Sequence, residues 1–249
     1  MEHKQSSEIP AEDAGSKAPR EPFFRAPQVV FWVIGFLALV HAVLIAGGED
    51  WRIWSLFAFS FIPARISGDV PFPAIYGSQV WAFVTYAFLH ADFLHLLFNS
   101  LWLLVFGSVV AKRLGALRFL VLSCVAAIAG AIAMLISFWG ETVIVLGASG
   151  ITSGLMGAAI PLMYGRGANR DVTLIIPLRP LEIVTDRRAL IFTIIWVSVT
   201  LVTGSRGLSS TAFVGENIIA WQAHLGGFFA GLVAFYLLDR GSVLRSAQA

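Results

Sequence analysis

Two side chains of this chain, Ser149 and His224, have the chemistry of a nucleophile and a general base, and each lies beside small residues in an apolar stretch. Small residues recur one helical turn apart near both, at Gly150, Gly154 and Ala158 and at Ala223, Gly227 and Gly231. Such stripes let two helix backbones approach closely. If the stripes face each other, the imidazole can take the hydroxyl proton while the oxygen attacks a carbonyl carbon.

Two further polar residues, His95 and Asn99, are four positions apart and therefore share one face of a predicted helix. A polar side chain in a membrane helix is costly unless it faces a partner or a watery cavity. Together with the backbone N–H of Ser149, these side chains are available as donors to an oxyanion. No carboxylate of the apolar stretches is placed to orient His224, so a dyad is expected rather than a triad.

The elements that must position these side chains are predicted to be membrane helices. Of the 249 residues 57% are hydrophobic and only 13% are charged, with a mean hydropathy of +0.80. Six stretches without formal charge are long enough, or nearly so, to cross a hydrocarbon core about 30 Å thick. They are 26–48, 93–111, 119–140, 142–165, 189–205 and 217–238. The sequence therefore predicts an all-α integral membrane protein with six spanning helices.

The placement of basic residues predicts the orientation of this bundle. With a cytoplasmic N-terminus, all of the 17 Lys and Arg residues except Arg52, Arg65 and Arg206 lie inside, and both termini are cytoplasmic. We expect the host membrane to be a bacterial inner membrane. The expected divisions of the chain are a flexible cytoplasmic tail at 1–27, a six-helix membrane domain at 28–240 and a short cytoplasmic tail at 241–249.

This topology places the four polar groups at one depth. Ser149 and His224 begin helices entered from outside, while His95 and Asn99 lie in the first two turns of a helix entered from the same face. All four are then roughly 5–10 Å below the outer surface at ~1.5 Å per residue. The β-branched run at 142–146 predicts an extended segment that dips into the protein and carries Ser149 below the surface.

The region 49–89 is apolar and aromatic but is broken by Pro63, Pro71 and Pro73, so neither part of it is predicted to span the membrane. Its tryptophans suit a loop that lies in the outer membrane interface, between the first and second spanning helices. An ordinary loop packed on the bundle is the alternative. The single cysteine, Cys124, lies inside the third stretch, so no disulfide framework and no thiol metal cluster is expected.

Several motifs in this order resemble the rhomboid family of intramembrane serine proteases. They cover the chain from about Trp81 to Gly231, and the combination is highly specific, whereas a lone GxSG would be weak evidence. The matching pieces are Gly147-Ala148-Ser149-Gly150, His90, His95 with Asn99, Lys112-Arg113-Leu114-Gly115 and Ala223-His224-Leu225-Gly226-Gly227.

The resemblance implies a role for each matching residue. Ser149 would be the nucleophile and His224 the general base, without a cofactor or a metal. The oxyanion hole would comprise His95, Asn99 and the backbone at Gly147 and Ser149, with His90 and Gly150 in support. The expected substrates are other transmembrane proteins of the same bilayer, cut within or beside a membrane segment.

The chain departs from the family pattern at three positions. Trp81 is followed by Ala82 where the family commonly has arginine, and Ser153 stands where an aromatic residue often supports the histidine ring. Ala111 stands where some members carry a glutamate. These departures concern the anchoring of the 49–89 region and the packing of the imidazole, while the reacting groups are all present.

Other classes of protein compete with this interpretation. A catalytically silent relative that binds membrane helices is the main alternative, although such relatives usually lack the serine or the histidine. A haem or metal protein using His90, His95 and His224 lacks a supporting carboxylate or cysteine, and a transporter lacks paired interrupted helices. The polar residues could also serve only as packing and hydrogen-bonding glue between helices.

Topology alone accounts for the basic loop at 166–188, so no nucleic acid partner is expected. The loop at 204–215 with the fifth helix is the expected substrate gate. The sequence leaves the oligomeric state and the physiological substrate open.

Overall fold

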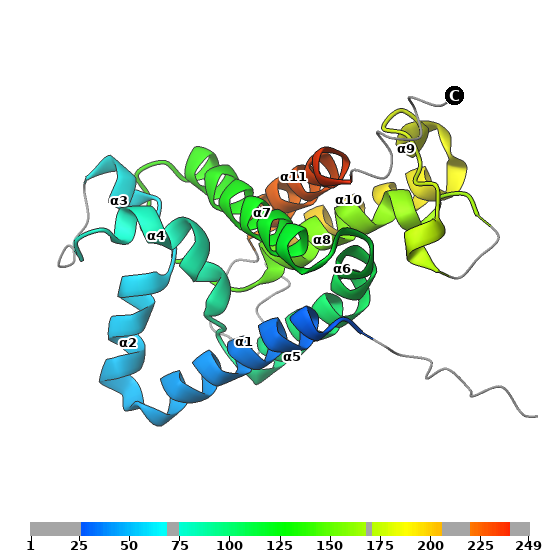
Figure 1. Ribbon diagram of the computed structural model, residues 1–249. Helices are drawn as coiled ribbons and strands as arrows, with labels where there is room; N and C mark the ends of the chain where they lie inside the picture. The colour runs from blue at the N-terminus through cyan, green and yellow to red at the C-terminus, as the bar shows by residue number, and fades with distance from the viewer. Residues whose placement is uncertain (1–25, 69–74, 168–170, 206–219, 240–249) are drawn as a thin grey trace, which may run out of the picture.

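The computed structural model describes residues 26–68, 75–167, 171–205 and 220–239, and within these ranges the chain is almost entirely helical (Figure 1). The only extended pairings there are two isolated antiparallel bridges. The helices are α1 (Gln28–Ala46), α2 (Gly48–Phe59), α3 (Ala64–Ser67), α4 (Ser78–Thr85), the 3₁₀ helix η1 (Tyr86–Phe88), α5 (Phe93–Trp102), the π-helical η2 (Leu103–Gly107), α6 (Ser108–Leu114), α7 (Ala116–Ser137), α8 (Ser149–Met163), the 3₁₀ helix η3 (Val172–Leu174), α9 (Glu182–Thr185), α10 (Arg187–Ser205) and α11 (Trp221–Leu238).

The six predicted apolar stretches each contain a helix. Within the described ranges, five helical runs are long and apolar enough to cross a membrane, namely α1, the continuous run α5–η2–α6, α7, α10 and α11. The sixth, α8, has only 15 residues, because the predicted extended segment at 142–146 precedes it. The prediction of an all-α helical bundle is therefore confirmed, while the tails at 1–25 and 240–249 lie outside the described residues.

The centre of the bundle consists of α7, α8 and α11 (Figure 1). Every residue of α8 from 150 to 162 is buried, as expected for a helix that is apolar on all sides. Leu122 and Met134 of α7 and Phe228 and Phe235 of α11 are also fully buried. A helix enclosed in this way provides a rigid support for the residue at its start, which is Ser149.

The backbones of α8 and α11 touch through glycines. A Cβ atom added to Gly227 would run into the carbonyl oxygen of Gly150, and one added to Gly231 would run into the backbone of Gly154. The two predicted stripes therefore dock on each other, and the order of the contacts makes the helices parallel. The pattern differs from the prediction further along α8, where Gly157 rather than Ala158 meets the backbone of Phe228.

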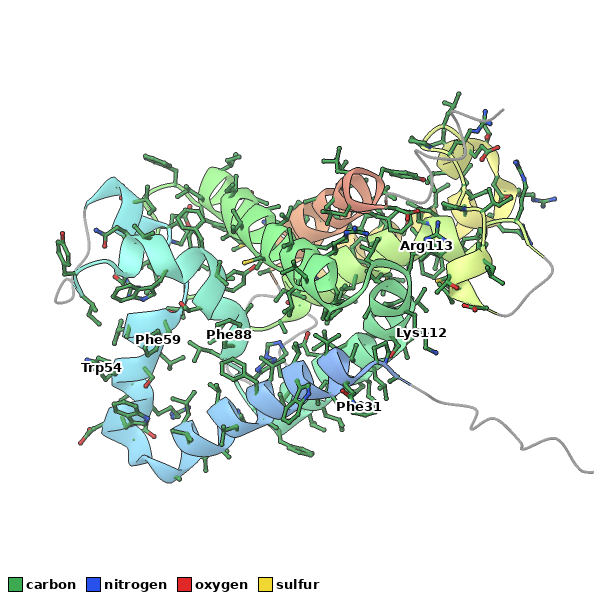
Figure 2. The ribbon with its side chains drawn as sticks, in the orientation of Figure 1. Phe31, Trp54, Phe59, Phe88, Lys112 and Arg113 are labelled. Atoms are coloured by element: carbon green, nitrogen blue, oxygen red, sulfur yellow. The ribbon has the colours of Figure 1, made fainter. Side chains whose placement is uncertain are left out.

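The region between α1 and α5 is more helical than the loop that the sequence predicts. Figure 1 shows α2 leaving the end of α1 at a sharp angle, with α3 and α4 beyond it. Trp81 Nε1 and Thr85 Oγ1 donate to the carbonyl oxygens of Ala58 and Phe59, each at 2.8 Å, and so join α4 to α2. The Trp51 and Trp54 rings of α2 stack with centroids 5.1 Å apart and are exposed. Figure 2 shows Trp54 on α2.

Candidate active site

Ser149 is the first residue of α8, and the segment before it is fixed on both sides. Phe61 and Val145 exchange two backbone hydrogen bonds of 3.0 and 2.9 Å, so the extended segment lies against the region after α2. Two residues before α8 begins, the Gly147 N–H donates to the carbonyl oxygen of Tyr86 at 3.0 Å. Ser149 therefore lies at a defined point, half-buried, at the start of a buried helix.

Gly147 must be a glycine for two independent reasons. Its φ of +115° lies in a region that residues with a Cβ rarely adopt. A Cβ atom there would also be 2.6 Å from Nε2 of His95, so the imidazole of α5 lies directly against this turn. The predicted proximity of His95 to the serine segment is therefore present in the structure.

The helix that carries His95 is capped just before that residue. Asp92 caps α5, and its Oδ1 accepts a hydrogen bond from the backbone N–H of His95 at 2.8 Å. The buried His90 ring meets the His95 ring edge to face, with centroids 5.1 Å apart. His90 thus supports the imidazole of His95 by packing.

Asn99 is linked to the first turn of α8 through a residue that sequence reasoning missed. Its amide donates to the His95 carbonyl at 2.9 Å, and its Oδ1 faces Thr152 Oγ1 at 3.5 Å. Thr152 Oγ1 also donates to the carbonyl oxygen of Ser149 at 3.1 Å. Thr152 is three residues after the serine and therefore on the same helical face, and this spacing could have identified it as part of the site.

His224 lies on the turn of α11 that faces the start of α8. Gly227 meets Gly150 through the backbone, and a Cβ atom on Gly150 would lie 3.6 Å from the carbonyl oxygen of Ala223. His224 is thus between two residues that contact the neighbour of Ser149. Among the described residues, the serine hydroxyl and the imidazole make no hydrogen bond with each other, and catalytic hydrogen bonds often tighten only when substrate is bound.

Tyr86 is a second residue that the sequence analysis did not single out. Its side chain is fully buried, and its hydroxyl donates to the Ala127 carbonyl of α7 at 2.9 Å. Cβ atoms on Gly130 and Gly150 would lie 2.8 and 2.9 Å from that hydroxyl. Because its carbonyl also holds Gly147, Tyr86 connects the serine segment with α7 and α8.

The departures from the family pattern are accommodated in the structure. Ala82 is buried without a charge to satisfy. The guanidinium of Arg65 in α3 donates to the carbonyl oxygens of Phe57 and Ser60 and so joins α3 to the end of α2. Ser153 and Ala111 are buried.

Residues that could hold a metal ion are not gathered at this site. Over the described ranges, no three His, Cys, Asp or Glu side chains form a group able to bind one. His90, His95 and His224 in particular do not form such a group. The arrangement offers a hydroxyl, imidazoles, an amide and the free N–H groups of a helix start, which is the chemistry of acyl transfer.

Comparisons with known proteins agree with this geometry. The Rhomboid domain family matches residues 77–240. The Rhomboid protease GlpG of Yersinia pestis (strain Pestoides F) is 29% identical over 194 residues, which are 73% of this chain and 59% of that protein. The Rhomboid protease GlpG of Yersinia enterocolitica (serotype O:8 / biotype 1B) is 30% identical over 168 residues, 66% of this chain and 50% of the relative. The chain thus spans between half and three fifths of the length of these relatives.

The family match covers well over half of the chain, including α4 to α11 and every residue of the candidate site. The relatives are themselves named as proteases. Together with the apolar helices, these matches make the protein a multi-pass integral membrane protein. The chain belongs to the rhomboid family.

Proposed function

We propose that this protein is an intramembrane serine endopeptidase that cleaves transmembrane segments with a Ser149–His224 dyad. The observation that carries the proposal is the backbone contact between Gly150 and Gly227, which brings the starts of α8 and α11 together. His95, against Gly147, supplies a third chemical group at the same place. The names of the relatives, Rhomboid protease, agree with this activity.

In the proposed reaction, Ser149 Oγ forms a bond to the scissile carbonyl carbon while its proton passes to His224. The carbon–nitrogen bond then breaks, and the imidazolium gives the proton to the leaving amine. Water attacks the resulting acyl-enzyme and loses a proton to His224. The ester bond to Ser149 Oγ then breaks, the imidazolium returns the proton to Ser149 Oγ, and the second product leaves as a carboxylic acid. No cofactor is needed for either half of the reaction.

The oxyanion formed in each half needs donors that are already in place. We assign this role to the His95 imidazole, the Asn99 amide and the backbone N–H groups at the start of α8. The first N–H groups of a helix lack partners within the helix, and the helix dipole favours negative charge there. Gly147 leaves the room that an approaching carbonyl group requires.

The expected substrates are membrane-spanning segments of other proteins in a bacterial inner membrane, with both termini of this chain in the cytoplasm. The proposed route of entry is beside α10, which buries few residues and whose contacts with α11 include those of Trp196 and Gly204. Most of the loop expected to act with it, at 204–215, lies outside the described residues.

A serine-directed fluorophosphonate probe tests the dyad on the purified protein in detergent. Ser149→Ala and His224→Ala should each abolish both labelling and cleavage of a transmembrane substrate while the protein remains folded. Ser123→Ala is the matched control, because it removes a buried serine of α7 that bonds only within its own helix and should leave labelling intact. Asn99→Ala should slow the reaction by about 10²–10³-fold if it supplies one oxyanion donor.

Retained cleavage in either dyad variant would contradict the assignment. If the folded wild-type protein is not labelled at all, the helix-binding alternative becomes the better description. In that case a tagged transmembrane segment should co-purify intact with the wild-type protein.

A further inference from the structure

The contact that brings Ser149 and His224 together does not fix how far α8 and α11 slide along each other. Glycine surfaces such as Gly150 against Gly227 and Gly154 against Gly231 are smooth, because they present no side chains that interlock. One helical turn is about 5.4 Å, so a small axial slip would separate the two reacting groups. Another part of the protein must hold the register.

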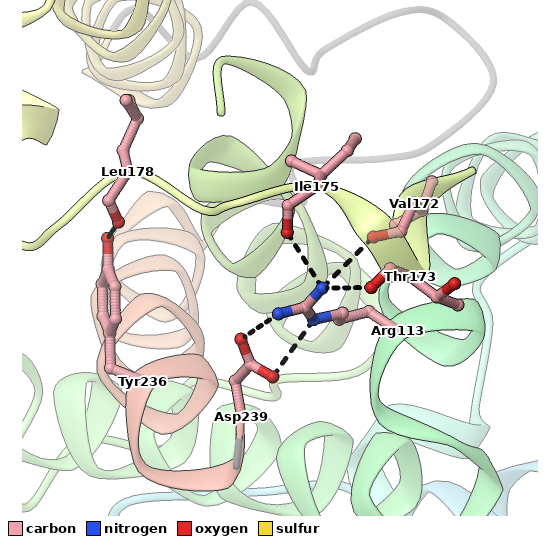
Figure 3. Close-up of polar contacts among 7 residues, drawn as sticks. All are labelled: Arg113, Val172, Thr173, Ile175, Leu178, Tyr236 and Asp239. Carbon is pink, nitrogen blue, oxygen red and sulfur yellow. Dashed lines mark hydrogen bonds and ion pairs between the residues drawn. The ribbon is translucent and has the colours of Figure 1, made fainter. Parts of the chain in front are cut away.

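The far end of α11 is held by a buried ion pair. Arg113, near the end of α6, donates from Nε to Asp239 Oδ1 at 3.1 Å and from Nη2 to Oδ2 at 2.9 Å (Figure 3). Both side chains are only 5% exposed. Asp239 directly follows α11, so this two-point contact fixes the end of the helix that carries His224 at its beginning.

The same guanidinium also binds the loop that follows α8. Its Nη1 donates to the carbonyl oxygens of Thr173 at 2.8 Å and Ile175 at 3.0 Å. Further along this loop, the Leu178 N–H donates to the Pro161 carbonyl of α8 at 3.0 Å. The carbonyl oxygen of Leu178 accepts from the Tyr236 hydroxyl of α11 at 2.7 Å (Figure 3).

Leu178 is therefore bonded to α8 on one side and to α11 on the other, and Arg113 ties its loop to the end of α11. We call Arg113, Asp239, Tyr236 and the segment 172–178 the loop clamp. A buried ion pair offsets its own desolvation poorly, and its best attested use is to specify one register among several. The loop clamp has the geometry for that use.

We propose that Arg113 is a positioning residue, which through the loop clamp sets the axial register of α8 and α11 and thereby the alignment of Ser149 with His224. The proposal rests on the proposed protease function. Arg113 acts at the ends of α8 and α11 that lie away from Ser149 and His224, so it touches neither reacting group.

The test is the kinetics of fluorophosphonate labelling in Arg113→Gln. The final labelled fraction reports how much protein is folded, whereas the rate constant reports the alignment of the dyad. We expect the rate constant to fall about tenfold or more with a final labelled fraction close to that of the wild type. Arg166→Gln is the matched control, because its partner Glu182 lies on the same loop but in an exposed ion pair, and its rate constant should not change.

Two milder variants keep the test informative if Arg113→Gln does not fold. Arg113→Lys keeps the charge but not the planar fork, and it should be intermediate in rate. Tyr236→Phe removes only the hydroxyl that binds Leu178, and it should slow labelling about threefold. An unchanged rate constant in both folded variants overturns the proposal.

A second measurement does not depend on activity. In a Ser149→Ala background, Arg113→Lys should increase hydrogen exchange at the first turns of α8 and α11, at Thr152 N–H and His224 N–H, relative to Arg166→Gln. Increased exchange with no labelling of the wild-type serine would support the loop clamp while refuting the protease assignment. Exchange unchanged at both turns would refute the loop clamp whatever the activity.

Discussion

Two apolar helices of this protein, α8 and α10, have opposite surroundings. Each residue of α8 from 150 to 162 is buried, whereas α10 is mostly exposed and buries only Ala189, Thr200 and Gly204 among its described side chains. Both pack against α11. The α8 contact is backbone against backbone through glycines, while the α10 contact is made by side chains, including the stacked rings of Trp196 and Phe228 with centroids 4.3 Å apart.

The difference separates a helix held by close backbone contact from one held through side chains. A glycine contact allows close approach but tolerates no added atom, because the obstructing group is backbone. A contact between aromatic side chains can be lost and regained with little change elsewhere. The helix that carries Ser149 is held in the first way, and the helix beside the proposed route of entry is held in the second.

The largest effect should come from adding one methyl group to the α8–α11 contact. Gly227→Ala should lower the free energy of unfolding by about 3 kcal/mol. Cleavage should fall by at least about 100-fold, because a displacement of about 1 Å is enough to misalign the reacting groups. Denaturant titration in mixed micelles and a cleavage assay measure the two effects.

Gly35→Ala on α1 is the control for that substitution, since a Cβ atom there meets nothing within 4 Å. It should be neutral in both assays. Equal tolerance of alanine at Gly227 and Gly35 would show that the close backbone contact is not needed.

Tyr86→Phe should have a smaller effect on stability and labelling, again through the support of α8. It removes the buried hydrogen bond to Ala127 and should cost about 1 kcal/mol of unfolding free energy. Because Tyr86 also contacts the start of α8, the labelling rate of Ser149 should fall severalfold. A labelling rate equal to that of the wild type would remove Tyr86 from the support of the site.

Trp196→Leu should weaken only the contact between α10 and α11. Loss of the stacked pair should cost about 0.5–1 kcal/mol, since leucine keeps part of the apolar contact with Phe228. The labelling rate of Ser149 by a small probe should not change, because α8 and its glycine contact are untouched. A tenfold loss of labelling would mean that α10 also positions the dyad.

The smallest effect should be a pH dependence confined to the start of α10. Asp186 Oδ1 accepts from the N–H groups of Ala189 and Arg188, and these bonds, with the nearby Arg188 guanidinium, lower the pKa of the carboxyl group. The cap is therefore fully present above the ordinary Asp pKa and is lost as the pH falls through the lowered value. Acidification should reduce the hydrogen-exchange protection of the first turn of α10.

The first turn of α8 should show no such change, since Ala148 precedes it and no side chain caps it. Asp186→Asn, which can still cap the helix, should remove the pH dependence from α10. Equal acid sensitivity of both helix starts would contradict this assignment.

Much of the fold follows from patterns that are local in the sequence. Charge-free stretches of sufficient length predict the helices, and small residues at a four-residue spacing predict which faces can approach closely. The site residues were recognisable because Ser149, His95 and His224 are expensive to place in apolar helices without a use. Their catalytic roles remain a proposal.

Other features could not be read from the sequence because they depend on contacts between distant segments. The contacts of Arg65 with the carbonyl oxygens of Phe57 and Ser60 join α3 to the end of α2. Thr152 and Tyr86 are ordinary helix residues by themselves, and only their neighbours give them a place in the site.

The sequence alone determined the class of protein, the six apolar stretches and the chemistry available at Ser149 and His224, because these follow from composition and from spacing along one chain. Only the tertiary structure decided that Gly227 meets Gly150 and that Arg113 ties the loop after α8 to the end of α11. The physical reason is that a stripe of small residues permits many alignments, whereas a buried guanidinium with five carbonyl and carboxylate partners satisfies its hydrogen bonds in one.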